Sequence, residues 1–270
     1  MSARLWPELD SLEQIMAAYP ILEFDPDPSA VIEPIHLVKR VEFPRLAVAC
    51  FFHEVIRRLV DDGRVSVLAI QRSEMGDHPI YSIEYEGRQL AVFHPTAGAP
   101  MAVALVEEVI AHGAKAIIGC GGSGALDAEL SLGQAVVPIS AIRDEGTSYH
   151  YLPPSREVNA SPAAVAAISA ALRHRNISYV ETKTWTTDAV YRETHAKVIA
   201  RRAEGCRVVE MEAAALFAVG QFRRVAIGEL LYAGDSVASG TWEHREWNDQ
   251  TAIRESIFWL ACDAACQIRD

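Results

Sequence analysis

The sequence predicts an α/β fold in which a central, largely buried sheet carries helices on both faces. Half of the 270 residues are hydrophobic, which is enough for one large domain with a well-buried core. Short apolar runs alternate along the chain with longer segments of helical periodicity. This alternation is the pattern of consecutive β-α-β units. No internal repeat, low-complexity tract or linker interrupts it, so we expect a single domain over residues 1–270.

Residues 1–44 are predicted to form an irregular N-terminal segment. A short amphipathic helix is expected from Ser11 to about Tyr19. The next stretch, residues 20–34, contains four prolines and several acidic residues, a composition typical of a chain that follows the surface. At Arg45 the pattern changes to a continuous apolar run over residues 46–52.

Turn and cap residues mark the elements that follow. Gly63 and Gly113 each end a helix, because glycine readily takes the left-handed conformation found there. Glu86-Gly87 predicts a hairpin turn, and Pro162 begins a helix with proline in its first turn. Strands are expected over residues 65–70, 80–85, 89–93, 114–118, 134–142, 178–186, 208–210 and 225–232, and helices over residues 53–62, 99–112, 162–174, 193–204, 211–220 and 249–268.

The composition argues against several partners and compartments. The net charge of −11 repels a polyanion, so no nucleic-acid partner is expected. No stretch approaches the roughly 18 consecutive apolar residues of a membrane span, and the N-terminus lacks the apolar core of a signal peptide. The five scattered cysteines favour free thiols in a reducing, cytoplasmic location, and their spacing predicts no metal site.

A glycine cluster at residues 119–124 fits the pattern G-x-G-x-x-G. A dinucleotide fingerprint opens a long crossover helix, but Gly133 and the next strand follow about ten residues later, too soon for that helix. The cluster is interpreted as a loop that binds an anion or a sugar, with a plain tight turn as the alternative. Its candidate donors are the backbone N–H groups of Gly121 and Gly122 and the hydroxyl of Ser123.

Two carboxylates flank Met211 at the boundary between a strand and a helix. Glu210 ends the strand, and Glu212 stands at the helix N-terminus, where the helix dipole is expected to keep its carboxylate ionised. An ionised carboxylate suits two adjacent sugar hydroxyls as a bidentate acceptor. The alternative is that Glu212 only stabilises the helix N-terminus, and these residues alone leave both interpretations open.

Five motifs occur in a telling order: Gly-Ser-Gly-Ala after a strand, residues 143–148, residues 186–188, residues 209–213 around Glu-Met-Glu, and Gly234-Asp235. Together they resemble the nucleoside phosphorylase superfamily, which includes uridine phosphorylase, hexameric purine nucleoside phosphorylase and methylthioadenosine nucleosidase. The resemblance runs from about residue 26 to the C-terminus and is most specific in the Glu-Met-Glu block. It implies a three-layer sandwich with a mixed, partly barrel-like central sheet, and an enzyme that cleaves the bond between a sugar and a nitrogenous base. It also implies a homo-oligomer, either a dimer or a hexamer, whose partner is a small-molecule nucleoside.

The resemblance also implies roles for single residues. Met211 and Glu212 contact the ribose, with Glu212 taking the 2′- and 3′-hydroxyls. Glu210 lies beside the base or ribose, and Ser123 lies between the sugar and anion sites. Asp235 protonates the leaving base, since an acid there stabilises the negative charge that builds as the glycosidic bond breaks. An ordinary Gly-Asp turn is the alternative for Asp235.

The sequence departs from the family's pattern at the phosphate site. The family's Gly-Asp-Pro-x-Arg motif has only residues 26–30 as its counterpart, without the glycine or the arginine. Gly119 stands where a second phosphate arginine is usual. Losing two arginines removes the strongest charge-assisted hydrogen bonds of such a pocket. The phosphate site is therefore absent or rebuilt, and the candidate groups are Gly121, Gly122, Ser123, Arg143 and His94, with Arg192 and Arg40 beside them.

The base site differs from that of uridine phosphorylases, whose uracil-binding Gln and Arg are missing after Asp188. This loss favours a purine or purine-like base, with Val190 and Tyr191 against it. Trp242 and Trp247 are expected either as a lid over the base or as packing against the last helix.

The sequence leaves three functions open. Phosphorolysis, with inorganic phosphate as co-substrate and no cofactor, is narrowly favoured because it is common in the family. Hydrolysis is the alternative because the usual phosphate arginines are absent, although the sequence does not identify the acidic residue that would activate water. A catalytically silent nucleoside-binding protein is the second alternative.

Overall fold

Ten strands form one continuous sheet in the computed structural model, which describes residues 19–39 and 41–268. In chain order they are β1 (Leu46–Cys50), β2 (Ser66–Ser73), β3 (Gly76–Tyr85), β4 (Arg88–Phe93), β5 (Ala116–Ala125), β6 (Ala135–Asp144), β7 (Glu157–Asn159), β8 (Tyr179–Thr187), β9 (Cys206–Glu210) and β10 (Ala226–Ser236). Their order in the sheet is β10-β6-β8-β9-β5-β1-β4-β3-β2, and β7 pairs with β6. Because β10 also pairs with β5, the five strands β10, β6, β8, β9 and β5 close into a barrel.

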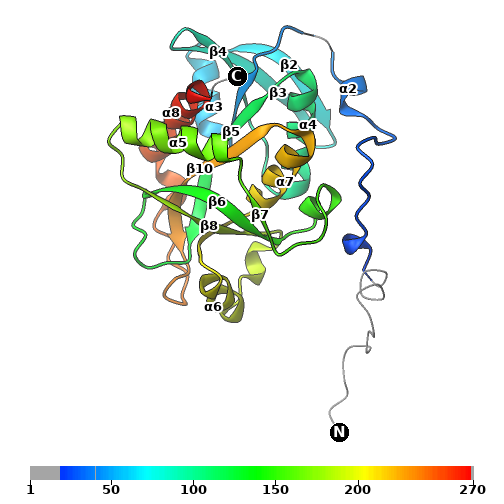
Figure 1. Ribbon diagram of the computed structural model, residues 1–270. Helices are drawn as coiled ribbons and strands as arrows, with labels where there is room; N and C mark the ends of the chain where they lie inside the picture. The colour runs from blue at the N-terminus through cyan, green and yellow to red at the C-terminus, as the bar shows by residue number, and fades with distance from the viewer. Residues whose placement is uncertain (1–18, 40, 269–270) are drawn as a thin grey trace.

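Helices cover both faces of this sheet (Figure 1). On one face α5 (Pro162–His174) packs against α8 (Thr251–Gln267), beside α3 (His53–Asp61). On the other face α4 (Ala99–His112) packs against α7 (Ala213–Arg223). Each face has its own apolar core, which contains Phe258 on the first side and Phe217 on the second. The predicted three-layer sandwich with a mixed, partly barrel-like sheet is confirmed. Within the described residues, no helix combines the length and apolarity that crossing a bilayer requires.

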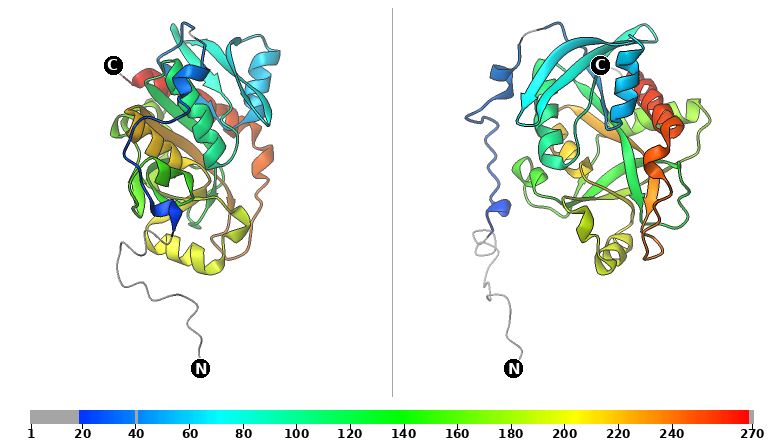
Figure 2. Two further views of the ribbon diagram at one scale, coloured as in Figure 1. Left: turned by 90° about the vertical axis from the view of Figure 1, so that its right-hand side faces the viewer. Right: turned by 180° about the vertical axis from the view of Figure 1, so that it is seen from behind.

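The N-terminal segment runs along one side of the sheet and its helices (Figure 2). It contains two short helical turns, η1 (Pro20–Leu22) and α2 (Pro34–Leu37), of which α2 lies near α4. The rest of its described part is irregular, as the prolines predict. The helix expected from Ser11 falls on residues 11–18, which lie outside the described residues, and Tyr19 is not helical.

The glycine cluster is not a loop, because β5 runs straight through it to Ala125. None of its four glycines has a positive φ, so backbone freedom does not explain them. They provide space instead. A Cβ at Gly119 would lie 2.8 Å from Cγ of Glu229, and one at Gly122 would lie 3.3 Å from the ring of Tyr232. The cluster therefore lets a strand pass beside large side chains of β10.

Two other expectations need correction at the ends of elements. Gly234-Asp235 lies inside β10, so the interpretation of Asp235 as part of an ordinary turn is wrong. The helix expected over residues 193–204 is α6 (His195–Ala203), which begins later because Thr194 caps it by accepting the Lys197 N–H at 3.4 Å. Before it, Val190–Arg192 form the separate turn η3. Neither β7 nor α2 was predicted from the sequence, because no pattern in their residues distinguishes them from irregular chain.

Candidate active site

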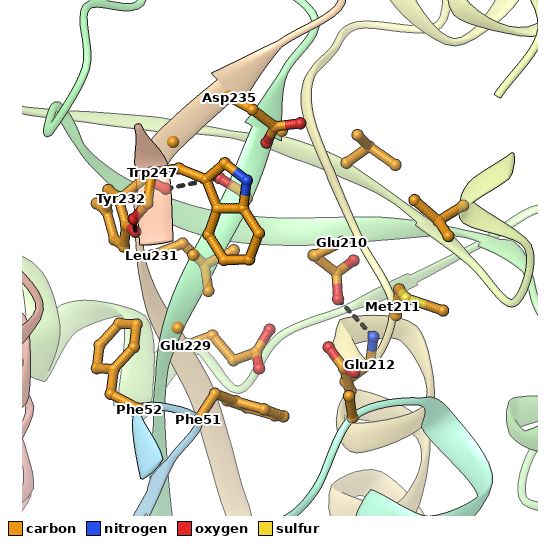
Figure 3. A pocket seen from close by; sticks show the side chains of 18 of the residues that line it. Phe51, Phe52, Glu210, Met211, Glu212, Glu229, Leu231, Tyr232, Asp235 and Trp247 are labelled. Atoms are coloured by element: carbon orange, nitrogen blue, oxygen red, sulfur yellow. Dashed lines mark hydrogen bonds between the residues drawn. The ribbon is translucent and has the colours of Figure 1, made fainter. Parts of the chain in front are cut away.

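A cavity of about 830 Å³ opens where β5, β9 and β10 meet the loops after β1, β4 and β8 (Figure 3). Its wall is acidic. The acids that line it are Glu193, Glu210, Glu212, Glu229 and Asp235. Among the described lining residues Arg254 is the only arginine, and there is no lysine. Because charges in a half-enclosed site are poorly screened, this imbalance constrains the ligand strongly.

Glu210 is buried, and its carboxylate is fully used by the protein itself. One oxygen accepts the hydroxyls of Thr184 and Thr186, at 3.2 and 2.6 Å. The other accepts the backbone N–H groups of Glu212 and Ala213, each at 2.6 Å, at the beginning of α7. Four donors satisfy this carboxylate, so Glu210 holds the strand-to-helix turn in place. Its predicted contact with base or ribose stays a prediction, although its side chain does line the cavity.

Backbone groups hold the carboxyl of Glu212 at the wall of the cavity. Its Oε1 accepts the Gly98 N–H at 2.5 Å, and the Met211 N–H also donates to this carboxyl. Burial, followed by the nearby charge of Glu210, raises the pKa of Glu212 to about 8. The expectation that the helix dipole keeps this carboxylate ionised was therefore wrong, because desolvation outweighs the dipole at a buried helix end.

This raised pKa predicts that removing the acid changes how stability depends on pH. An unfolded glutamate loses its proton near pH 4.5, whereas folded Glu212 keeps it up to about pH 8. The stabilising contribution is therefore complete below pH 4.5 and is lost as the pH rises through 8. We expect the difference in melting temperature, Glu212→Gln minus the natural protein, to increase between pH 5 and pH 9, as measured by scanning calorimetry. A constant difference over this range would contradict the assignment.

Glu229 is a functional candidate that the sequence analysis missed. It lies in the middle of β10 with 1% of its surface exposed, and its Oε2 has no hydrogen-bond partner among the described residues. Burial, together with the charges of Glu210 and Glu212, raises the pKa of its carboxyl well above the usual range. The signal in the sequence that could have identified Glu229 is an acid inside an otherwise apolar strand.

Asp235 lies on the side of the cavity away from Glu212 (Figure 3), and it forms a second acidic pair with Glu193, which also lines the cavity. Oδ2 of Asp235 accepts the indole N–H of Trp242 at 2.7 Å. Glu193 follows η3, and burial together with the nearby Asp235 charge raises its pKa to about 7. A carboxyl group with a pKa of about 7, such as that of Glu193, can donate a proton near neutral pH. The sequence analysis named Asp235 for this role but not Glu193.

The other predicted contact residues mostly reach the same cavity. Val190, Tyr191, Met211, Gly121 and Gly122 all line it. Ser123 lines it too, but its hydroxyl donates to the carbonyl of Tyr232 at 3.0 Å, which leaves the oxygen free to accept rather than donate. Within the described residues, no group of three or more His, Cys, Asp or Glu side chains is arranged to hold a metal ion.

Comparison with known proteins decides the family. The family model described as the phosphorylase superfamily matches residues 45–257, which is most of the chain. The chain belongs to the phosphorylase superfamily. Guanosine phosphorylase of Halorubrum lacusprofundi is 27% identical over 206 residues, covering 73% of this chain and 85% of that protein. Uridine phosphorylase of Treponema pallidum is 29% identical over 182 residues, covering 62% and 70%.

Solved structures of superfamily members share the fold. Uridine phosphorylase of Vibrio fischeri gives a TM-score of 0.71 at 24% identity, covering 84% of this chain and 92% of that one. AMP nucleosidase of Bacteroides thetaiotaomicron gives 0.68 at 24% identity, covering 84% and 90%. The predicted membership is confirmed, and the chain is an enzyme of the nucleoside phosphorylase and nucleosidase kind.

Of the candidates for a rebuilt phosphate site, Gly121, Gly122, Ser123 and His94 line the cavity, but neither Arg143 nor Arg192 does. Arg143 does not line the cavity, because its guanidinium binds Ser148, Ser155 and two carbonyls of its own loop at 2.6 to 3.1 Å. His94 does line the cavity, but burial and the nearby His53 lower its pKa and favour the neutral ring. Arg192 and residues 26–30 are not part of the wall, and Arg40 lies outside the described residues. The residues that directly follow β1 and line the cavity are two apolar side chains, Phe51 and Phe52, rather than charged ones.

The two tryptophans favour the lid interpretation over packing against the last helix. Both line the cavity, and Trp242 is 63% exposed although its indole reaches Asp235. The carbonyl of Trp247 accepts the hydroxyl of Tyr232 at 2.8 Å, which ties this loop to β10. The loop therefore borders the side of the cavity that holds the acidic pair.

Proposed function

We propose that this enzyme cleaves the N-glycosidic bond of a nucleoside that carries a purine or purine-like base. The observation that carries the proposal is the position of Glu212, a buried carboxyl group that lines the cavity and has its Oε1 fixed by the Gly98 N–H. Such a group suits a pair of adjacent sugar hydroxyls. Met211 beside it supplies an apolar contact for the same sugar, as the family resemblance implies.

The acidic pair supports a leaving group that needs a proton. As the bond to the sugar breaks, negative charge builds on the base, and a general acid nearby stabilises it. Asp235 and Glu193 supply this acid, while Tyr191 and Trp242 offer aromatic faces for stacking. A purine, with a basic ring nitrogen beyond the one bound to the sugar, fits such a donor better than uracil does.

The charge of the cavity wall favours water over phosphate as the nucleophile. The resemblance to the family narrowly favoured phosphorolysis. However, five acids face one arginine here, and Arg254 is already paired with Glu54 at 2.8 Å. Among the described lining residues a phosphate dianion would find no lysine and no unpaired arginine, and every carboxyl group that is ionised would repel it. Hydrolysis to the free sugar is therefore the mode that the geometry supports best.

The test is base release from a panel of guanosine, inosine, adenosine, uridine and cytidine, with and without inorganic phosphate. We expect release from at least one purine nucleoside and much slower release from the pyrimidine nucleosides. Release from pyrimidine nucleosides alone would overturn the base assignment. The absence of release from every member, with nucleoside binding intact in calorimetry, would instead favour the nucleoside-binding alternative.

A further inference from the structure

Glu229 is a buried acid in the cavity wall, and its Oε2 has no hydrogen-bond partner in the described part of the chain. Glu229 stands opposite Gly119 in the pairing of β10 with β5. Its Oε1 would lie 3.0 Å from a Cβ at position 119, and its Cγ only 2.8 Å. Any side chain at position 119, an arginine included, would displace the Glu229 side chain. The Glu229 side chain therefore requires a glycine at position 119. Gly119 stands where the resemblance places a phosphate arginine.

A buried carboxyl group without a hydrogen bond destabilises the fold. Leaving such a group unsatisfied typically costs about 1–3 kcal/mol, and more if it is charged. Oε2 of Glu229 is in this state, whereas Glu210 has four donors and Glu212 accepts from the backbone of Gly98 and Met211. A group retained at this cost in a ligand cavity is expected to meet its partner in the ligand. When Glu229 is ionised, both oxygen atoms of its carboxylate accept, so the partner of Oε2 in that state must be a hydrogen-bond donor.

The surroundings of Glu229 restrict the kind of donor further. The ionisable groups that act on it are Glu210 and Glu212, and the neighbouring Cys120 thiol is buried. None of these groups carries a positive charge, so the described surroundings of Glu229 offer nothing that would hold an anion at this position. Figure 3 shows the carboxyl of Glu229 facing the same space as that of Glu212, beside Phe51. The donor therefore sits next to the proposed sugar, in space bounded by acids and an aromatic ring.

We propose that Glu229 binds a water molecule beside the sugar and acts as the general base that activates it for attack on the anomeric carbon. This inference rests on the proposed function and names its nucleophile. The water oxygen forms a bond to the anomeric carbon while its proton passes to the Glu229 carboxylate. The bond between that carbon and the base nitrogen breaks, and its electron pair goes to the nitrogen. The pair Asp235 and Glu193 gives the base its proton, and the proton on Glu229 returns to solvent after release of the free sugar.

The environment of Glu229 suits both parts of this role. A raised pKa makes the carboxylate a stronger base than an exposed glutamate. As the bond to the base breaks, positive charge develops on the sugar, and a nearby carboxylate stabilises it in a poorly solvated site. The same positive charge offsets the repulsion that Glu229, Glu210 and Glu212 exert on one another when they are ionised. The wall is thus complementary to the transition state rather than to the neutral substrate.

The decisive experiment compares the natural protein with Glu229→Gln and Glu229→Ala on the best purine nucleoside, in buffer free of phosphate. We expect the natural protein to release base without phosphate, and oxygen from ¹⁸O-labelled water to appear on the sugar. Glu229→Gln should lower kcat by about 10²- to 10⁴-fold, the usual contribution of a general base, with little change in nucleoside binding measured by calorimetry. It should also remove the rise of kcat/KM with pH on the acid side of the profile. Sodium formate should restore part of the activity of Glu229→Ala.

Stability measurements separate this role from a structural one. Because Glu229 is buried without a partner, Glu229→Gln should raise the melting temperature, and by more at pH 8 than at pH 6. The matched control is Glu107→Gln, at a buried acid outside the cavity that pairs with Arg223 at 2.8 Å. Glu107→Gln should lower the melting temperature and leave kcat/KM unchanged.

The outcomes distinguish this inference from the proposed function. Base release that requires phosphate and yields a sugar 1-phosphate would overturn the role of Glu229 and leave glycosidic cleavage standing. A phosphate-free rate of base release in Glu229→Gln within about threefold of the natural rate would also overturn the role of Glu229, since a general base contributes far more. Glycosidic cleavage would again stand. If the natural protein released no base from any nucleoside, the proposed function would fail and this inference with it.

Discussion

Replacing Glu212 by glutamine is expected to lower kcat/KM for a ribonucleoside by about 10²-fold. Above about pH 8, where Glu212 is ionised, a hydrogen bond to its charged carboxylate contributes about 1.5–3 kcal/mol, and each 1.4 kcal/mol corresponds to a tenfold change in rate. Glutamine keeps the shape of the side chain and can still accept the Gly98 N–H, so the turn at α7 should remain intact. The measurement is steady-state kinetics on the best purine nucleoside of the panel.

Deoxynucleosides provide the control for this prediction. The natural enzyme should prefer the ribonucleoside over its 2′- and 3′-deoxy analogues, because each lost hydroxyl leaves Glu212 with one donor fewer. In Glu212→Gln this preference should largely disappear. If the variant discriminated against both analogues as strongly as the natural enzyme does, Glu212 would not be the group that holds the sugar.

Replacing Asp235 by asparagine is expected to slow purine release by about 10²-fold or more, the usual contribution of general acid catalysis. The amide oxygen can still accept the indole N–H of Trp242, so the loop should keep its position. The companion variant Glu193→Gln shows which acid carries the proton. The pKa of Glu193 is about 7, so removing it should abolish the fall in kcat/KM above neutral pH.

A substrate with a good leaving group tests the cause of this loss. In p-nitrophenyl riboside the leaving group departs without being protonated, so Asp235→Asn should cleave it at nearly the natural rate. An equal loss on this substrate and on the purine nucleoside would mean that Asp235 positions the substrate rather than supplying a proton. Normal purine release by Asp235→Asn would remove it from the mechanism altogether.

The sequence by itself determined the layered fold and the family, because both depend on local patterns. Apolar periodicity and cap residues placed α4 over residues 99–112 and α5 from Pro162 to His174 as the structure has them. The Glu-Met-Glu block was specific enough to indicate the superfamily, and the family model confirms it. The sequence also predicted correctly that Glu210 and Glu212, which are near one another in the chain, lie in the same site. Their chemistry was harder to predict, because the pKa of Glu212 depends on burial that the sequence does not state.

Only the tertiary structure decided which distant groups share the cavity and which partners they have. The pattern of the glycine cluster fits a loop equally well, until the neighbouring β10 shows that its glycines make room for Glu229 and Tyr232. Arg143 was a reasonable phosphate ligand by sequence, but its own loop binds its guanidinium. Glu229 was overlooked because an acid in an apolar strand has meaning only when its burial and missing partner are known. Hydrogen-bond satisfaction and desolvation depend on every neighbouring element at once, so they follow from the folded arrangement and not from the order of residues.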